Sequence, residues 1–135
     1  MRVPVCSHFV CGLIVLYHSA YAATIQCPQI IQTNQSLHQE IKDWDAFADE
    51  SNVINQFERI TFYSGHPKEN ASLAPDHENS EVKKLTWTFG KQETWIACNY
   101  THTKIQLIRK LPDGIKSCTV TYNANFSTVM AINCI

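Results

Sequence analysis

The segment 93–122, ETWIACNYTHTKIQLIRKLPDGIKSCTVTY, constrains the fold more than any other part of the chain. It holds two cysteines and three runs in which the residues alternate in character with a period of two. Such alternation is typical of β-strands, whose successive side chains point to opposite faces. Between the last two runs, Pro112 presets its own φ and Gly114 tolerates a positive φ, so a turn is expected there. The segment therefore predicts the centre of a small antiparallel sheet that a disulfide holds together.

Other parts of the chain carry the same kind of signal. A first strand is expected to begin at Cys27-Pro28, at a sheet edge, because proline lacks the N–H that a ladder requires. Short strands joined by turns predict a mainly β fold, namely a small antiparallel sandwich or partly open barrel with one short helix and two disulfides. Alternation in the second strand puts Phe57 on one face and both Ile60 and Phe62 on the other. Strands beyond the first and the central segment are predicted at 57–64, 85–90 and 128–134.

The segment 41–51 shows weak helical spacing. Ile41, Trp44, Phe47 and Ala48 lie at positions i, i+3, i+6 and i+7, with acidic residues around them. A short helix and a structured loop both remain open for this segment. In either case, Trp44 and Phe47 are expected to pack onto the sheet as anchors.

Residues 1–22 have the layout of a secretory signal peptide. Arg2 is followed by the apolar run 9–16 and then by Ala20-Tyr21-Ala22, a small-x-small pattern with cleavage expected before Ala23. The apolar run falls short of the roughly 20 residues that a membrane-spanning helix needs. We therefore predict a periplasmic or secreted protein without a membrane span after cleavage, in which residues 23–135 form a single disulfide-bonded, β-rich domain.

Four cysteines remain after removal of the leader, which indicates a disulfide framework in an oxidising compartment. Four cysteines allow three pairings. Position along the chain favours Cys98–Cys118, within one stretch of strands, and Cys27–Cys134, near the two ends of the expected domain. Zinc is not favoured, because no two of these cysteines have a short metal-binding spacing.

Composition and motifs argue against several classes of function. The chain has a formal net charge of −1 and no basic run, which does not suggest nucleic-acid binding. No metal-binding histidine spacing or nucleophile motif occurs, and paired cysteines offer no thiolate nucleophile. We therefore expect no catalytic residue, no metal site and no cofactor. The alternative enzyme hypothesis is a small cell-wall hydrolase that uses the region around His66, Asp76 and His77.

Several blocks of the sequence resemble one family of proteins. These blocks are Cys27-Pro28, ITFYSG (60–65), the P-x-E-x-A-S-L-x-P-D segment (67–76), W-T-F-G (87–90), W-x-A-C-x-Y (95–100) and R-K-L-P-x-G-x-K-S-C-T-V-T-Y (109–122). They are similar to a functionally uncharacterised family of small exported proteins of Gram-negative bacteria, some of them near contact-dependent secretion clusters. The resemblance implies a periplasmic location and a role as an immunity or inhibitor protein, and it carries over no catalytic residue.

The polar segment 65–84 is the first candidate for recognition of a partner. It predicts a surface excursion with one helical turn between Lys68 and Leu73, and long polar loops on a rigid scaffold often carry function. A solvated loop without a partner is the plain alternative. The predicted protein-binding residues at this loop and at two further loop tips are Tyr63, His66, Lys68, Glu69, His102 and Asp113.

The function that these observations favour is recognition of another protein, with immunity to a toxin or inhibition of a hydrolase as its purpose. A structural envelope protein without a discrete ligand is the remaining alternative besides the hydrolase.

Overall fold

The computed structural model describes residues 22–49 and 54–135 and confirms a mainly β fold. The leader predicted at 1–22 lies almost entirely outside the described residues. Strands account for 46% of the described residues against 3% for helix, and every strand pair among them is antiparallel. The strands are β1 (Ala23–Ile25), β2 (Ile30–Gln32), β3 (Ile54–Ser64), β4 (Ser72–Leu73), β5 (His77–Asn79), β6 (Lys84–Thr88), β7 (Thr94–Tyr100), β8 (Gln106–Lys110), β9 (Ser117–Tyr122) and β10 (Val129–Cys134).

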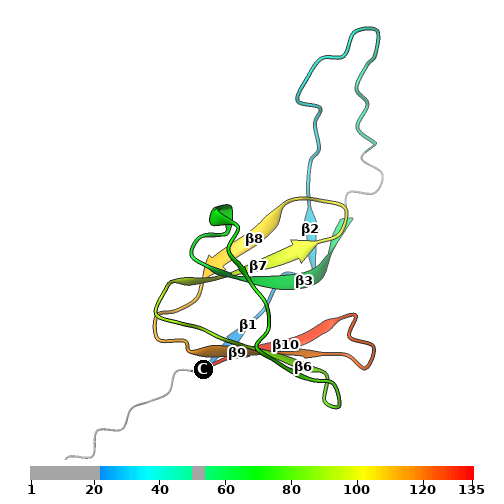
Figure 1. Cartoon of the computed structure of the whole chain (residues 1–135). Helices are drawn as coiled ribbons and strands as arrows, with labels where there is room; N and C mark the ends of the chain where they lie inside the picture. The colour runs from blue at the N-terminus through cyan, green and yellow to red at the C-terminus, as the bar shows by residue number, and fades with distance from the viewer. Residues whose placement is uncertain (1–21, 50–53) are drawn as a thin grey trace, which may run out of the picture.

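The strands form two sheets that lie one above the other (Figure 1). The first sheet has the order β1-β10-β9-β6-β5, and the second has the order β2-β3-β7-β8, with the short β4 paired to β3. Only one short helical element occurs among the described residues, the 3-10 turn η2 (Pro67–Glu69). Two stacked sheets confirm the prediction of a small antiparallel β fold.

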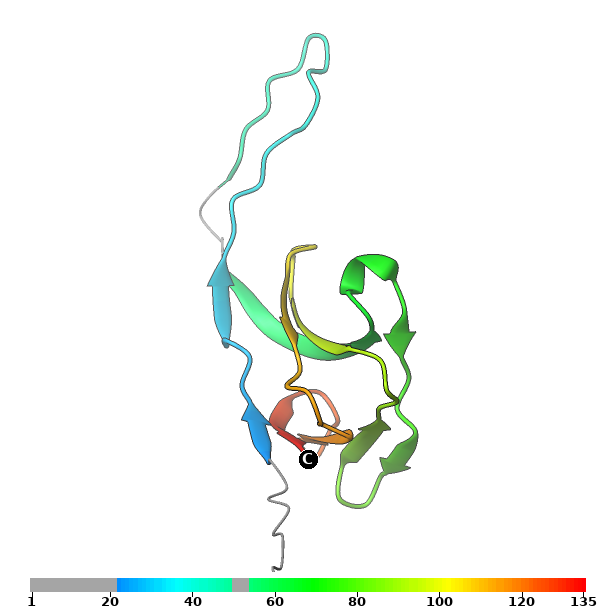
Figure 2. The same ribbon diagram turned by 90° about the vertical axis from the view of Figure 1, so that its left-hand side faces the viewer.

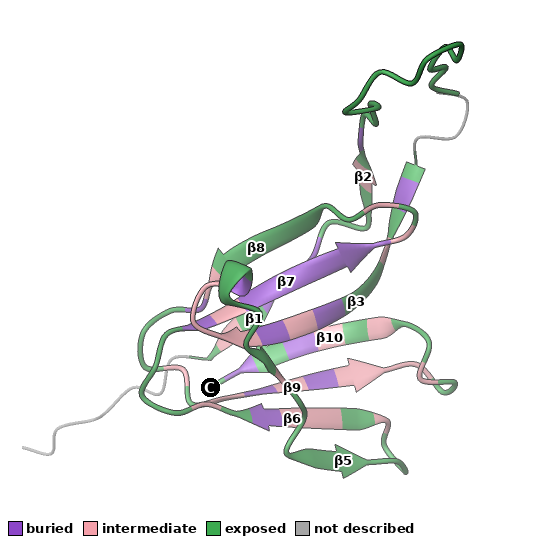
Figure 3. Ribbon diagram, turned by 45° about the horizontal axis from the view of Figure 1, so that its top comes forward, coloured by how far each residue is buried: buried purple, intermediate pink, exposed green. Residues whose placement is uncertain are grey.

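Aromatic side chains join the two sheets through a common core. Phe62 of β3 is fully buried, and its ring centroid lies 5.1 Å from that of Trp87 and 5.2 Å from that of Phe89, both from the other side of the core. Val120 and Ile132 are also buried there. Burial follows alternate positions along β9, as the period-two pattern predicts (Figure 3).

A β-bulge in β3 changes one predicted side-chain direction. The register with β7 shifts between Phe57 and Arg59, which adds one residue to β3. Phe57 therefore packs against the same core as Ile60 and Phe62. The prediction that Phe57 faces away from those two residues was wrong, because simple alternation does not hold across a bulge.

The segment 93–122 does not form the centre of one sheet, as the sequence predicted, because it contributes to both. β7 and β8 pair with each other in the second sheet, whereas β9 lies in the first sheet. The connection between β8 and β9 begins at the buried Leu111, whose N–H donates to Thr94 O, and ends where Lys116 O accepts from the Phe89 N–H. The predicted turn at Pro112–Gly114 therefore carries the chain from one sheet to the other.

Both disulfides exist, but their pairing differs from the prediction. The bonds are Cys27–Cys98 and Cys118–Cys134, with Cα–Cα distances of 5.9 and 4.1 Å. Antiparallel pairing of β9 with β10 places Cys118 directly opposite Cys134, whereas Cys98 lies in the other sheet. Proximity along the chain misled the prediction because the strand register decides which cysteines meet.

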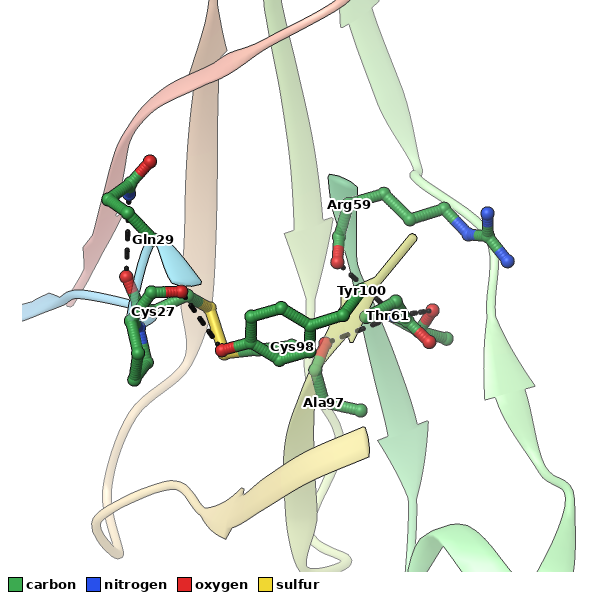
Figure 4. Close-up of a disulfide and its surroundings, with 9 residues drawn as sticks. Cys27, Gln29, Arg59, Thr61, Ala97, Cys98 and Tyr100 are labelled. Atoms are coloured by element: carbon green, nitrogen blue, oxygen red, sulfur yellow. Dashed lines mark hydrogen bonds between the residues drawn. A yellow bond between two sulfur atoms is a disulfide. The ribbon is translucent and has the colours of Figure 1, made fainter. Parts of the chain in front are cut away.

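Cys27 lies between two edge strands, at the point where the chain passes from one sheet to the other. The prediction of one strand beginning at Cys27-Pro28 was therefore wrong, although the expected edge position was right for both β1 and β2. Around the Cys27–Cys98 bond, the Tyr100 hydroxyl donates to Pro28 O at 3.0 Å (Figure 4). This bond and the disulfide fix residues 27 and 28 against β7.

The connection between β2 and β3 includes residues 33–49, which we call the arm. The arm extends away from both sheets in two perpendicular views (Figures 1 and 2). It contains no helix, and its tip is a turn in which the Trp44 N–H donates to Ile41 O at 3.1 Å. Trp44 and Phe47 remain 80% and 89% exposed. The prediction that these two side chains anchor on the sheet was therefore wrong.

Candidate protein-binding surface

The structure brings Tyr63 and His66 together with Trp95 at one end of the second sheet. The strand register places Tyr63 directly opposite Trp95. The His66 ring packs on the Trp95 indole with a centroid distance of 4.7 Å and an interplanar angle of 59°. Tyr63, His66 and Trp95 are all partly exposed at this end of the sheet, and we call these three residues the aromatic cluster.

His66 is held in place by its role at the start of η2. Its Nδ1 accepts a hydrogen bond from the Lys68 N–H at 3.2 Å, which is the contact of an N-cap residue. The preceding Gly65 has φ +82°, and a Cβ there would lie 2.7 Å from Glu69 Oε2. Lys68 and Glu69 themselves are exposed on η2. The helical turn predicted between Lys68 and Leu73 is thus present, but it ends at Glu69.

A small ion-pair cluster lies at the same end of the sheet. Lys110 Nζ lies 2.9 Å from Glu93 Oε1 and 3.2 Å from Asp113 Oδ1. The hydrogen bond from Lys110 and its positive charge lower the pKa of the Glu93 carboxyl, and the same hydrogen bond raises the pKa of Lys110. Because Trp95 pairs with Lys110 in the ladder, Asp113 lies at the same end as the aromatic cluster.

The Trp95 N–H is buried but has no acceptor within hydrogen-bond geometry among the described residues. The Trp95 side chain still lowers the pKa of the Glu93 carboxyl further, after the larger contribution of Lys110. The indole is therefore held by its packing against His66 and by its place in β7.

His102 lies apart from the other predicted binding residues. It occupies the turn between β7 and β8 with φ +58°, at the end of β8 opposite to Asp113. Its carbonyl accepts a hydrogen bond from Gln35 Nε2 at 3.1 Å, which ties it to the base of the arm. It also lines a groove of about 870 Å³ between the two limbs of the arm. The six predicted residues therefore fall into two groups at opposite ends of one sheet.

Sequence reasoning missed the surface that connects these two groups. Register pairing places a set of side chains on the side of the second sheet opposite to Phe62, and we call this set the outer face. A polar network around the buried Asn99 holds its middle: Asn99 Nδ2 donates to Thr61 Oγ1 at 3.1 Å, and Asn99 Oδ1 accepts from Gln106 Nε2 at 2.6 Å. The outer face comprises Arg59, Thr61, Tyr63, Trp95, Ala97, Asn99, Gln106, Ile108 and Lys110, of which Ala97 and Asn99 are buried.

The strand β8 forms an open edge of this surface. It pairs with β7 alone within the described part of the chain, so its second edge presents free backbone groups. Leu107 and Ile108 of this strand are each 39% exposed, and Ile105 just before it is 48% exposed. Alternation alone could locate these residues in strands, but only the register shows that Trp95 and Ile108 share a face with Tyr63.

The residues of the alternative hydrolase hypothesis do not converge on one site. His66 packs over the second sheet, whereas Asp76 Oδ2 accepts from the Thr88 N–H at 2.6 Å and His77 lies in β5 of the first sheet. Across residues 22–49 and 54–135, no group of three or more His, Cys, Asp or Glu side chains has the geometry to hold a metal ion. The outer face offers packing and hydrogen bonding instead, which are the means by which proteins recognise one another.

Comparison with known proteins also favours a role in protein recognition over the hydrolase alternative. No helix within the described residues is long and apolar enough to cross a membrane. No curated protein and no solved structure matches the chain. Residues 49–135, which include all of the second sheet except β2, match one family of immunity proteins, and such a role does not favour the hydrolase alternative. The chain belongs to the Type VI secretion system Tli immunity protein family.

Proposed function

We propose that this chain is an exported immunity protein that neutralises a type VI toxin by binding it directly in the periplasm. Membership of an immunity family supports protection against a toxin. The predicted leader and the two disulfides support action outside the cytoplasm, where disulfides persist. The outer face supports direct binding of a protein partner.

The single observation that carries direct binding is the composition of the outer face. Partly exposed aromatic rings of Tyr63, His66 and Trp95 lie beside the charged cluster around Lys110, and Ile108 continues the apolar surface to the open edge of β8. Protein interfaces combine such aromatic groups at their centre with a polar rim. An extended segment of the toxin pairing with the β8 edge is compatible with this arrangement.

A competition assay tests the proposal. A recipient strain without this gene is exposed to bacteria that deliver type VI effectors, with and without the full-length chain supplied on a plasmid. The chain is expected to protect against one effector and to bind that effector when both are purified. Production without residues 1–22 is expected to abolish protection; full protection by that cytoplasmic form would contradict a periplasmic action.

A point variant tests the outer face. Tyr63→Ala removes one ring of the aromatic cluster, and we expect it to weaken effector binding at least about tenfold. The matched control is Thr121→Ala, which changes a partly exposed strand residue of the first sheet. Equal affinities for both variants and the unchanged chain would exclude the outer face as the contact surface.

A further inference from the structure

The arm exposes large apolar side chains that the fold does not use. Leu37, Ile41, Trp44 and Phe47 are 55%, 45%, 80% and 89% exposed, all within residues 33–49. Exposed apolar side chains that gather on one segment mark an interaction site more often than scattered ones do. Trp is also among the residues that dominate the binding energy of protein interfaces.

The base of the arm is built from buried polar contacts. Thr33 Oγ1 donates to Asn55 Oδ1 at 2.8 Å, and Asn55 Nδ2 donates to Thr101 O at 2.8 Å. Thr33 and Asn55 are only 6% and 3% exposed. Gln35 adds its hydrogen bond to the carbonyl of His102. The arm therefore leaves the body from a fixed position and direction, although its tip makes no contact with the sheets (Figure 2).

The charge of the arm specifies the kind of surface that it fits. It carries the carboxylates of Glu40, Asp43, Asp45 and Asp49 against the single cation of Lys42. Among the described residues, no salt bridge involves Glu40, Asp43 or Asp45. Apolar side chains surrounded by acidic groups are complementary to an apolar cleft whose rim carries lysine or arginine.

The extent of the family match separates the arm from the shared domain. The match begins at Asp49, so it includes the outer face but leaves out residues 33–48. The match also leaves out β1 and β2, so residues 33–48 of the arm belong to an N-terminal region outside the matched part, which leads into β3. A segment outside the shared part is suited to distinguish one toxin from another.

From these observations we propose that the arm is a second toxin-binding element, which inserts Trp44 and Phe47 into an apolar cleft of the toxin that is rimmed by basic residues. The arm then determines which toxin is recognised, while the outer face supplies contacts of the shared domain. This inference rests on the proposed function, because it assumes that the partner is the toxin.

The test measures binding of the full-length mature chain to the effector against which it protects in the competition assay. Trp44→Ala and Phe47→Ala are each expected to weaken binding about 30-fold, as for residues at the centre of an interface. Met130→Ala is the matched control, because Met130 is 65% exposed on β10 of the first sheet, whereas the arm connects two strands of the second sheet. Unchanged melting temperatures for all three variants show that the effects arise at the interface.

The charge component has its own variants. Asp43→Asn with Asp45→Asn is expected to slow association and to reduce its dependence on salt. Asn is suited to position 43, because Asp43 has φ +67° and asparagine tolerates that conformation. Glu81→Gln, an exposed carboxylate outside the arm, serves as the control and is expected to leave both quantities unchanged.

The outcomes separate the two proposals. Arm variants that bind the effector as tightly as the unchanged chain would overturn the role of the arm and leave the immunity function intact. A chain that binds no effector at all would overturn the immunity mechanism, and the role of the arm with it. Loss of acrylamide quenching of Trp44 fluorescence in the complex, assigned by comparison with Trp44→Phe, would confirm that this side chain becomes buried.

Discussion

Replacing two phenylalanines in turn gives a sharp test of which aromatic side chains stabilise the fold. Phe62 is fully buried between the sheets and packs on Trp87 and Phe89, whereas Phe47 is 89% exposed on the arm. The same change to alanine is made at both positions. The structure therefore predicts opposite results from one chemical substitution.

The expected loss at Phe62 follows from the environment of its ring. Truncation of a buried Phe to Ala lowers the free energy of unfolding by about 3–5 kcal/mol, since transfer energy is lost and a cavity remains. Each of the two aromatic contacts contributes about 0.5–1.5 kcal/mol beyond buried area, which places Phe62→Ala near the upper end of that range. For a domain with a total stability of about 5–15 kcal/mol, this loss removes a large part of the free energy of unfolding. Phe47→Ala is expected to change the free energy of unfolding by less than about 0.5 kcal/mol.

Urea unfolding followed by circular dichroism measures both values, and thermal unfolding provides a second estimate. A loss of about 4 kcal/mol corresponds to a decrease in melting temperature of roughly 15 °C or more for a domain of this size. A loss above about 2 kcal/mol in Phe47→Ala would refute the exposed arm and restore the sequence-based prediction of an anchor on the sheet. A loss below about 1 kcal/mol in Phe62→Ala would refute the packing of the two sheets.

Three further predictions concern the Cys27–Cys98 disulfide and the pH dependence of stability. Non-reducing peptide mapping is expected to find Cys27 linked to Cys98, which are separated by 71 residues. Replacing both cysteines with alanine should lower the free energy of unfolding by about 4 kcal/mol, because the unfolded chain regains the entropy of the closed loop. A peptide that links Cys98 to Cys118 would contradict the fold. Burial raises the pKa of Tyr100 above its usual value of 10.0, so the unfolded chain releases that proton first and stability should fall as the pH rises past about 10. Lys110 lowers the pKa of Glu93 below 4.5, so the contribution of that ion pair should be lost as the pH falls below this value. Urea midpoints measured between pH 3 and 11 check both limits, and a midpoint that keeps increasing above pH 10 would contradict the sign for Tyr100.

The sequence allowed prediction of those features that depend on local pattern. Alternation located the strand that contains Trp87 and the strand that contains Val120, because each has one face in the core and one outside it. Tyr63 and His66 were selected because a strand end followed by glycine and proline predicts a turn, and the structure places both in an aromatic cluster. Their role in binding remains a prediction.

Features that depend on pairing between distant segments were not accessible in this way. The partner of Cys98 is decided by which sheet each strand joins, and the pairing of Tyr63 with Trp95 is decided by the strand register. Neither the cysteine pairing nor the strand register is encoded in local periodicity. The apolar residues of the arm misled for a different reason: helical spacing was assumed to mean burial, whereas Trp44 and Phe47 are exposed and available to a partner.

The position of β10 has a consequence for the order in which the domain is completed. β10 comes last among the described strands along the chain, yet it lies between β1 and β9 within the first sheet. It also supplies Cys134, so neither the complete first sheet nor the Cys118–Cys134 bond can form until residues 129–134 are available. β1 therefore has no partner strand during synthesis of the preceding residues. This topology therefore delays completion of the first sheet until the last described strand is available.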